Sequence, residues 1–233
     1  MKNVFYLFLI LTLISCGNIS PKGNIEAKDV KVEDFVNLNL EGNFRVFYIK
    51  SDSSFVNIET YENIADNLRI KVKDKTLSIT EKRPTEGVDF YNITLYSKYT
   101  LEKISLSETV EMNISSEIKT DNFKLNLKKS AKFIGSVNSR RTDVDMMDKS
   151  RANFRGTSKS AFLKISDTAS LIAPFWTIRN LNIDSENENY AEVTVTDSLK
   201  GNIKNTSKFV YYADPIRAIT IEKTATVENK NLE

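Results

Sequence analysis

Residues 125–171 read LNLKKSAKFIGSVNSRRTDVDMMDKSRANFRGTSKSAFLKISDTASL, and this stretch decides the fold. Within it, a small residue, a polar residue and an apolar residue recur as a triplet. The triplet returns along the chain at intervals of 16 to 22 residues, as Val110-Glu-Met112, Ala131-Lys-Phe133, Ala152-Asn-Phe154, Ala169-Ser-Leu171, Ala191-Glu-Val193 and Ser207-Lys-Phe209. A second apolar series lies between the triplets, at Leu106, Leu125, Val144, Leu163, Leu181 and Leu199. Two interleaved series with a common period near 19 residues indicate a repeating unit that contains at least two short strands.

Such a unit cannot bury its apolar face alone, and stacking on its neighbours solves this problem. The sequence therefore predicts an all-β protein built as a parallel β-helix (β-solenoid), with the right-handed winding that parallel connections prefer. Each coil should add ~4.8 Å along the axis. Asn, Asp and Ser in the turns should form ladders from coil to coil. The alternative is a β-sandwich or meander whose strands happen to be evenly spaced.

The chain before the repeats alternates apolar and polar residues but lacks the 19-residue phase. Val36-Asn-Leu38-Asn-Leu40 and Leu68-Arg-Ile70-Lys-Val72 show this strand pattern, and Glu62–Asn67 could form one helical turn. We expect residues 24–100 to be an irregular N-terminal β portion, either further coils or a separate β-domain. The solenoid repeats would occupy residues 101–227, and residues 228–233 would form a polar tail.

The first residues have the features of an export signal. Lys2 precedes the apolar run Val4–Ile14, which is too short to cross a bilayer as a helix and fits a signal peptide over residues 1–15. Leu13-Ile14-Ser15-Cys16 resembles a bacterial lipobox, in which Cys16 is lipidated, and residues 16–23 would then be a tether. An ordinary signal peptide is the alternative. Gly17 stands where an aspartate would signal inner-membrane retention, which favours the outer membrane; the side of the membrane stays open.

Composition excludes several classes of function. The chain has 233 residues, 33 Lys and Arg against 31 Asp and Glu, no histidine and one cysteine. Near-neutral charge argues against a nucleic-acid partner. The lack of histidine excludes a Ser-His-Asp triad and His-ligated metals, and one cysteine excludes a disulfide framework. The sequence thus predicts no cofactor, no metal and no catalytic residue. The expected partners are the membrane, through the lipid, and a glycan or an envelope protein, with the oligomeric state left open.

Aromatic residues are the candidates for ligand contact. They are Phe175, Trp176, Tyr91, Tyr96, Tyr211 and Tyr212. Clustered exposed aromatic side chains mark binding surfaces, whereas buried ones would only fill the core.

Acidic residues carry the enzymatic alternative. Asp143 and Asp145 would lie on one strand face, about 7 Å apart. Paired carboxylates can hydrolyse glycosides, so a polysaccharide-degrading hydrolase or lyase stays open. The competing interpretation is a solvated face that alternates with buried Val144 and Met146 and pairs with nearby arginines.

Several motifs occur in an order that resembles the GIN-domain family, the head domains of auto-transporter adhesins. The similarity begins at Gly23-Asn24-Ile25, continues through Leu38–Gly42 and the hairpin Lys73–Ile79, and ends at Phe209–Pro215. Lys75 and Ala213 replace glycines of the family pattern. The resemblance implies a β-helical fold in a secreted or lipid-anchored protein and carries no catalytic residues.

The leading functional hypothesis is therefore a lipid-anchored, non-enzymatic β-solenoid of the cell envelope that acts as an adhesin or as a module that binds carbohydrate or protein. A structural envelope protein that forms oligomers through its solenoid ends is a further alternative.

Overall fold

The structure is a computed structural model that describes residues 17–230, so the predicted signal peptide and Cys16 lie outside the described residues. It is a β-solenoid of about seven turns with 67% of the chain in strands, which confirms the predicted fold. Its elements are β1 (Ile25–Lys31), β2 (Asn37–Gly42), β3 (Arg45–Lys50), β4 (Phe55–Tyr61), α2 (Glu62–Ala65), β5 (Leu68–Lys73), β6 (Thr76–Glu81), β7 (Tyr91–Ser97), β8 (Lys103–Glu108), β9 (Glu111–Ile114), β10 (Ile118–Leu127), β11 (Lys132–Met146), β12 (Arg151–Ile165), β13 (Ser170–Ser185), β14 (Tyr190–Ile203), β15 (Lys208–Tyr212), β16 (Ile216–Ile221) and β17 (Thr226–Lys230).

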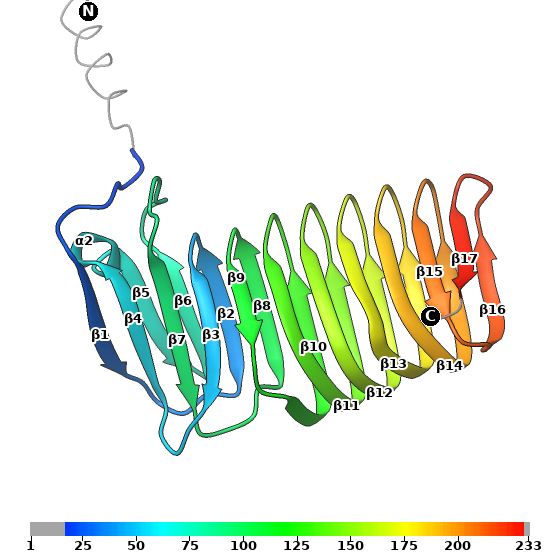
Figure 1. Cartoon of the computed structure of the whole chain (residues 1–233), viewed down its shortest axis with the longest axis horizontal. Coiled ribbons are helices and arrows are strands. Elements are labelled where there is room, and N and C mark those ends of the chain that lie inside the picture. The colour runs from blue at the N-terminus through cyan, green and yellow to red at the C-terminus, as the bar shows by residue number, and fades with distance from the viewer. Residues whose placement is uncertain (1–16, 231–233) are drawn as a thin grey trace, which may run out of the picture.

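Two layers of strands face each other across the core (Figure 1). Face A contains β1, β4, β7, β3, β9, the first halves of β11 to β14, β15 and β17. Face B contains β5, β6, β2, β8, the second halves of β10 to β14, and β16. From β8 onward every pairing is parallel, which excludes the antiparallel sandwich.

The N-terminal portion is continuous with the repeats. Strands β2 and β3 lie between β6 and β7 on one side and β8 and β9 on the other. Buried residues from both portions belong to one hydrophobic cluster. The coils therefore follow a spatial order that differs from the order along the chain, and this is why residues 24–100 show no simple phase.

The register of the coils corrects the predicted triplets. Phe133 pairs with Ala152, not with Phe154, and Ala152 pairs with Leu171. The recurring alanines therefore occupy two adjacent inward files, which explains their uneven spacing. One of these files reads Phe133, Ala152, Leu171, Ala191 and Phe209 through the coils.

Large and small side chains compensate within each coil. Phe133 is followed two positions later by Gly135, whereas Ala152 is followed by Phe154. A Cβ atom on Gly135 would lie 2.8 Å from Cζ of Phe133. In each of these two coils, one of the two inward positions holds a large side chain and the other a small one. The total volume, and therefore the packing density of the core, stays similar from one coil to the next.

The second apolar series is also shifted in part. Leu125, Val144 and Leu163 are in register as predicted. Leu163 pairs with Ile183, however, and Leu106 pairs with Leu127. A shift of two residues keeps a side chain on the inward face, so an apolar pattern cannot distinguish the two registers.

The turns between coils form a continuous polar ladder, as predicted. One residue of each turn has a positive φ angle, and these residues are Glu108, Lys129, Asp148, Asp167, Asn187 and Asn205. Asp148 Oδ2 accepts a hydrogen bond from the Lys129 amide, and Asp167 Oδ2 accepts one from the Asp148 amide. Asn and Asp suit these positions because they tolerate the left-handed conformation and can bond to neighbouring backbone.

The two ends of the solenoid differ. At the N-terminal end, β1 pairs antiparallel with β4, and α2 places the fully buried Ile64 in the core. At the C-terminal end, β16 and β17 form the last coil. Strand β17 continues to Lys230, so residues 228–230 belong to the solenoid and not to the predicted tail.

Candidate ligand-binding face

Three of the predicted contact residues lie in the core. Trp176 is fully buried, and Tyr91 and Tyr211 are 5% and 1% exposed. Their assignment to a ligand surface was wrong, because the structure directs all three side chains inward; only Tyr91 follows a regular period-two alternation. At Pro174 and the register shift beside it, the alternation of β13 breaks. Ala173 is inward before the break and Trp176 is inward after it, so Trp176 is buried and Phe175 is exposed.

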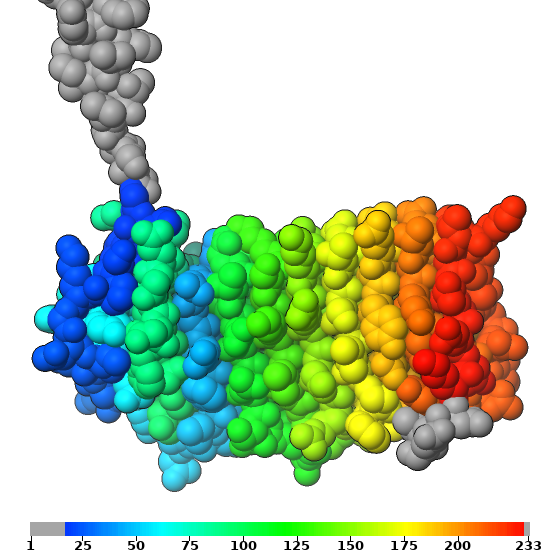
Figure 2. Space-filling model, turned by 45° about the horizontal axis from the view of Figure 1, so that its top comes forward, coloured from blue at the N-terminus to red at the C-terminus, as the bar shows by residue number. Residues whose placement is uncertain are grey.

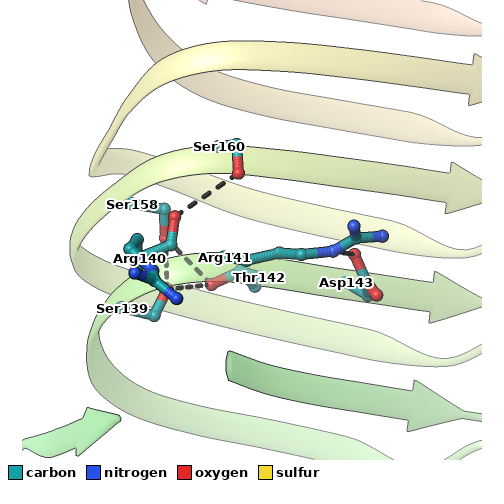
Figure 3. Close-up of polar contacts among 7 residues, drawn as sticks. All are labelled: Ser139, Arg140, Arg141, Thr142, Asp143, Ser158 and Ser160. Carbon is teal, nitrogen blue, oxygen red and sulfur yellow. Dashed lines mark hydrogen bonds and ion pairs between the residues drawn. The ribbon is translucent and has the colours of Figure 1, made fainter. Parts of the chain in front are cut away.

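Trp176 has a structural role at a corner of the solenoid. Its Nε1 donates a hydrogen bond to Oγ of Ser158 at 3.0 Å, and its ring stacks on Phe154. Ser158 in turn bonds with the hydroxyl groups of Ser139 and Thr142, at 3.1 and 2.9 Å (Figure 3). This network satisfies the indole N–H, which would otherwise be buried without a partner.

The remaining predicted residues lie on face A or near its edge. Tyr212 is 9% exposed, and its hydroxyl donates to the carboxylate of Glu192, which also accepts from Tyr190. Tyr96 is half-buried and stacks on Phe55 with 4.1 Å between ring centroids. Phe175 is 72% exposed. The six predicted residues therefore do not form one site.

A residue that the sequence analysis missed, Phe162, lies at a better candidate site. It points outward from the centre of face B and is 38% exposed. In the register of the coils it lies between Asp143 and Asn182. The signal was present in Ala161-Phe162-Leu163: strand alternation with Ala161 and Leu163 inward places the phenyl ring in solvent.

A shallow depression of about 270 Å³ surrounds this ring and is called the Phe162 site below. Its lining comprises Arg141, Asp143, Ser160, Ala161, Phe162, Asn180, Leu181, Asn182 and Lys200. Four successive strands, β11 to β14, contribute to it, so the parallel stacking of the coils fixes the spacing of its side chains.

The polar side chains of the Phe162 site are held in place by the scaffold. Arg141 Nε donates to Asp143 Oδ1 at 2.9 Å, as Figure 3 shows. Asn180 accepts a hydrogen bond from Ser198 Oγ at 2.7 Å and donates to the carbonyl oxygen of Lys159. The half-buried Asn182 and the exposed Lys200 complete the rim.

This arrangement fits the two surfaces of a sugar ring. The aromatic face can pack against the C–H groups of a pyranose, since that contact is apolar. The surrounding carboxylate, amide and cationic groups supply acceptors and donors for hydroxyl groups.

The acidic residues that suggested hydrolysis do not share a depression. Asp143 lines the Phe162 site, whereas Asp145 lines a separate depression with Ser105 and Asn126. Asp143 is also paired with Arg141. Among residues 17–230, no three Cys, Asp or Glu side chains gather in a way that could hold a metal ion.

The described part of the chain contains no helix that is both long and apolar enough to cross a lipid bilayer.

Comparison with known proteins finds one matching family and several solved structures with the same fold. Residues 34–215 match the family described as "Putative auto-transporter adhesin, head GIN domain". No protein with a curated description matches this sequence.

Solved structures share the whole fold at low sequence identity. A "putative adhesin" from Bacteroides fragilis has a TM-score of 0.80 and 20% identity, with 92% of this chain and 100% of that chain covered. A "putative adhesin" from Parabacteroides merdae has a TM-score of 0.71 and 18% identity, covering 91% and 99%. A "putative lipid binding protein" from Parabacteroides distasonis has a TM-score of 0.68 and 18% identity, covering 93% and 100%. At such identities the similarity establishes the fold.

Proposed function

We propose a function for this chain from the premise that it belongs to the GIN-domain family of adhesin head domains. It is a non-enzymatic binding module of the bacterial cell envelope. A lipid on Cys16 anchors it there. We propose further that the Phe162 site binds a pyranose unit of a surface glycan. The family match supports the adhesin-like role and a place in the envelope or at the surface. The lipid anchor rests on the lipobox pattern of residues 13–16.

The observation that carries the glycan proposal is an exposed phenyl ring at the centre of a polar sheet face. Asp143 and Asn182 lie on either side of it in adjacent coils. The ring points away from the core and is 38% exposed. Its position among ordered hydrogen-bonding groups gives a ligand both an apolar contact and a preferred orientation.

The first described residues support the position of the anchor. Arg83 Nη2 donates to the carbonyl oxygen of Gly17 at 2.6 Å, and Asn18 Nδ2 donates to Glu86 at 2.8 Å. Ile19 forms a β-bridge with Thr85. The predicted tether is thus bound to the N-terminal end of the solenoid, where it can be followed in Figure 2. An anchor at residue 16 would therefore hold this end of the solenoid at the membrane.

Glycan binding by the chain from Gly17 to Glu233 tests the proposal. We expect binding to a subset of a bacterial and host glycan panel, with a dissociation constant in the range of about 0.1–1 mM for a single site. Phe162→Ala should reduce the affinity at least ~10-fold because the stacking surface is lost. Phe162→Trp should retain binding.

The matched control is Phe175→Ala, which removes a more exposed aromatic ring from face A. It should leave glycan binding unchanged. Equal loss of binding in both variants, or glycan cleavage that Asp143→Asn abolishes, would reject the proposed site. The anchor is tested separately in the producing bacterium, where Cys16→Ser should move the protein from the membrane fraction to the soluble fraction.

A further inference from the structure

The two ends of the solenoid are built in different ways, and the last strand of face B lacks the charges found on the outer strands of the N-terminal end. At the N-terminal end, the outer strands carry repeated exposed charges, Lys28 and Lys31 on β1 and Arg69, Lys71 and Lys73 on β5. Charged residues on an edge strand oppose the addition of another strand.

The last strand of face B lacks this protection. Strand β16 reads IRAITI and has one charged residue, Arg217. Ile216 is 78% exposed and Ile221 is 47% exposed. Ile219 and Ile221 continue the inward files of Gly201 and Ile203, so their side chains lie at the open end of the core.

The backbone of the last coil also has a free side. The backbone N–H of Glu222 donates to the carbonyl oxygen of Ile203, and that of Thr226 donates to the carbonyl oxygen of Ser207. The backbone groups of these two residues therefore point toward the preceding coil. Backbone groups in a parallel strand alternate in direction. The N–H and C=O groups of Arg217, Ile219 and Ile221 in β16, and of Val227 and Asn229 in β17, therefore point away from the solenoid.

We infer that this C-terminal end is a homodimer interface, in which a second copy of the chain docks end to end. A twofold axis perpendicular to both faces would pair β16 with β16 of the partner and β17 with β17 of the partner, both antiparallel. Both faces then continue from one copy into the other, and each copy closes the open core of its partner. The charged edges of β1 and β5 disfavour the head-to-tail arrangement.

The charges of β17 complement a second copy of the same strand. Glu228 and Lys230 lie on the same side of β17, on either side of Asn229. Within one chain, the Glu228 carboxylate is 3.3 Å from Lys230 Nζ and 3.6 Å from Lys208 Nζ. Antiparallel pairing centred on Asn229 places each Glu228 opposite a Lys230 of the other copy, twice by symmetry. Opposite charges directly across an antiparallel pair are favourable.

Arg217 is already occupied and does not oppose this contact. Its Nη1 donates to the Tyr211 hydroxyl at 3.0 Å across the end of the core. The guanidinium group thus has a partner within its own chain.

Sedimentation equilibrium of the chain from Gly17 to Glu233, over a wide range of protein concentrations, tests the interface. We expect a monomer–dimer equilibrium. Ile219→Lys should weaken dimerisation at least ~100-fold, since it would place a charged group in the apolar contact that closes the open end of the core. The matched control is Ile70→Lys, which places the same change at a half-buried isoleucine of the N-terminal edge strand β5 and should leave dimerisation unchanged.

A cross-link provides a readout that does not depend on affinity. The tested chain lacks Cys16, so Asn229→Cys would carry its only thiol. Paired residues on the axis lie close enough for a disulfide, and mild oxidation should yield a covalent dimer. A chain that stays monomeric at all concentrations, a dimer that Ile219→Lys does not weaken, or filaments instead of dimers would each overturn the inference.

Discussion

At the scale of single residues, the surroundings of Glu81 change the pKa of its carboxyl group. Glu81 ends β6 and accepts a hydrogen bond from Thr85 Oγ1 at 2.9 Å. Partial burial raises the pKa of its carboxyl group, and the hydrogen bonds from Thr85 and from the Asn43 backbone oppose this rise. The folded state therefore favours the protonated form more than the unfolded state does. The contribution of protonated Glu81 to the stability of the fold is complete below the pKa that this carboxyl group has in the unfolded chain. It is lost as pH rises through the higher pKa of the folded state.

Glu81→Gln should therefore stabilise the protein at neutral pH. The amide is uncharged and keeps an oxygen that can accept from Thr85. We expect a gain of less than about 1 kcal/mol in the free energy of unfolding at pH 7.5, because solvent screens a half-exposed group. The gain should vanish near pH 4, where the wild-type carboxyl group is itself protonated. Urea unfolding at both pH values measures this.

The control for this prediction is Glu59→Gln on β4, where the side chain is exposed. It should change stability little at either pH. A Glu81→Gln variant that is less stable than wild type at pH 7.5 would show that the ionised carboxylate is favoured after all.

At the scale of elements, the turn ladder links each coil to the next. Asp167 has a φ of 59° and accepts hydrogen bonds on both sides of its coil, from the Asp148 amide and from Asn187 Nδ2. The ladder combines conformational tolerance with hydrogen bonding, so its residues support two coils at once. Sequence alone predicted the ladder because Asp and Asn recur in the turns with the period of the coils.

Asp167→Ala should destabilise the protein by about 1–3 kcal/mol, because alanine is unfavourable at positive φ and cannot accept the two hydrogen bonds. Asp167→Gly should cost less, since glycine adopts this conformation freely. Chemical denaturation of the two variants measures the difference. Lys164→Ala, on the exposed face of β12, is the control. Equal stability of Asp167→Ala and wild type would contradict the role of the ladder.

At the scale of the whole molecule, one coil from near the N-terminus lies between two coils that follow each other in the sequence. Strands β2 and β3 pair with β6 and β7 and also with β8 and β9. All later coils stack in chain order. Loss of the first coil should therefore disrupt the molecule far more than loss of the last, because interfaces between neighbouring coils supply most of the stability of a solenoid.

Removal of residues 214–233 should leave a folded protein with a lower melting temperature and a cooperative transition. Removal of residues 17–50 should prevent folding, since the two groups of strands beside β2 and β3 would lose their common partner. Thermal unfolding followed by circular dichroism, together with limited proteolysis, distinguishes these outcomes. A cooperative transition in the second variant would show that the later coils fold independently of β2 and β3.

The candidate site shows where sequence reasoning reached its limit. The family, the solenoid fold and the turn ladder were confirmed. The aromatic candidates were chosen by residue type and clustering, and these criteria do not reveal which face of a strand a residue occupies near an irregularity. Phe175 and Trp176 were both predicted to contact a ligand, but at the register shift beside Pro174 Trp176 is buried and only Phe175 is exposed. Phe162 was overlooked because it lies inside a short apolar run.

The amino-acid sequence by itself determined that this chain is a β-solenoid with polar, laddered turns, because a period of two within strands and a period near 19 between them are local properties. Only the tertiary structure decided which inward positions are stacked, where β2 and β3 insert, and which aromatic rings reach solvent. The physical reason is that a shift of two residues preserves the inward and outward pattern, so the choice among registers depends on how large and small side chains fit across coils. Surface sites and free edges follow from that choice.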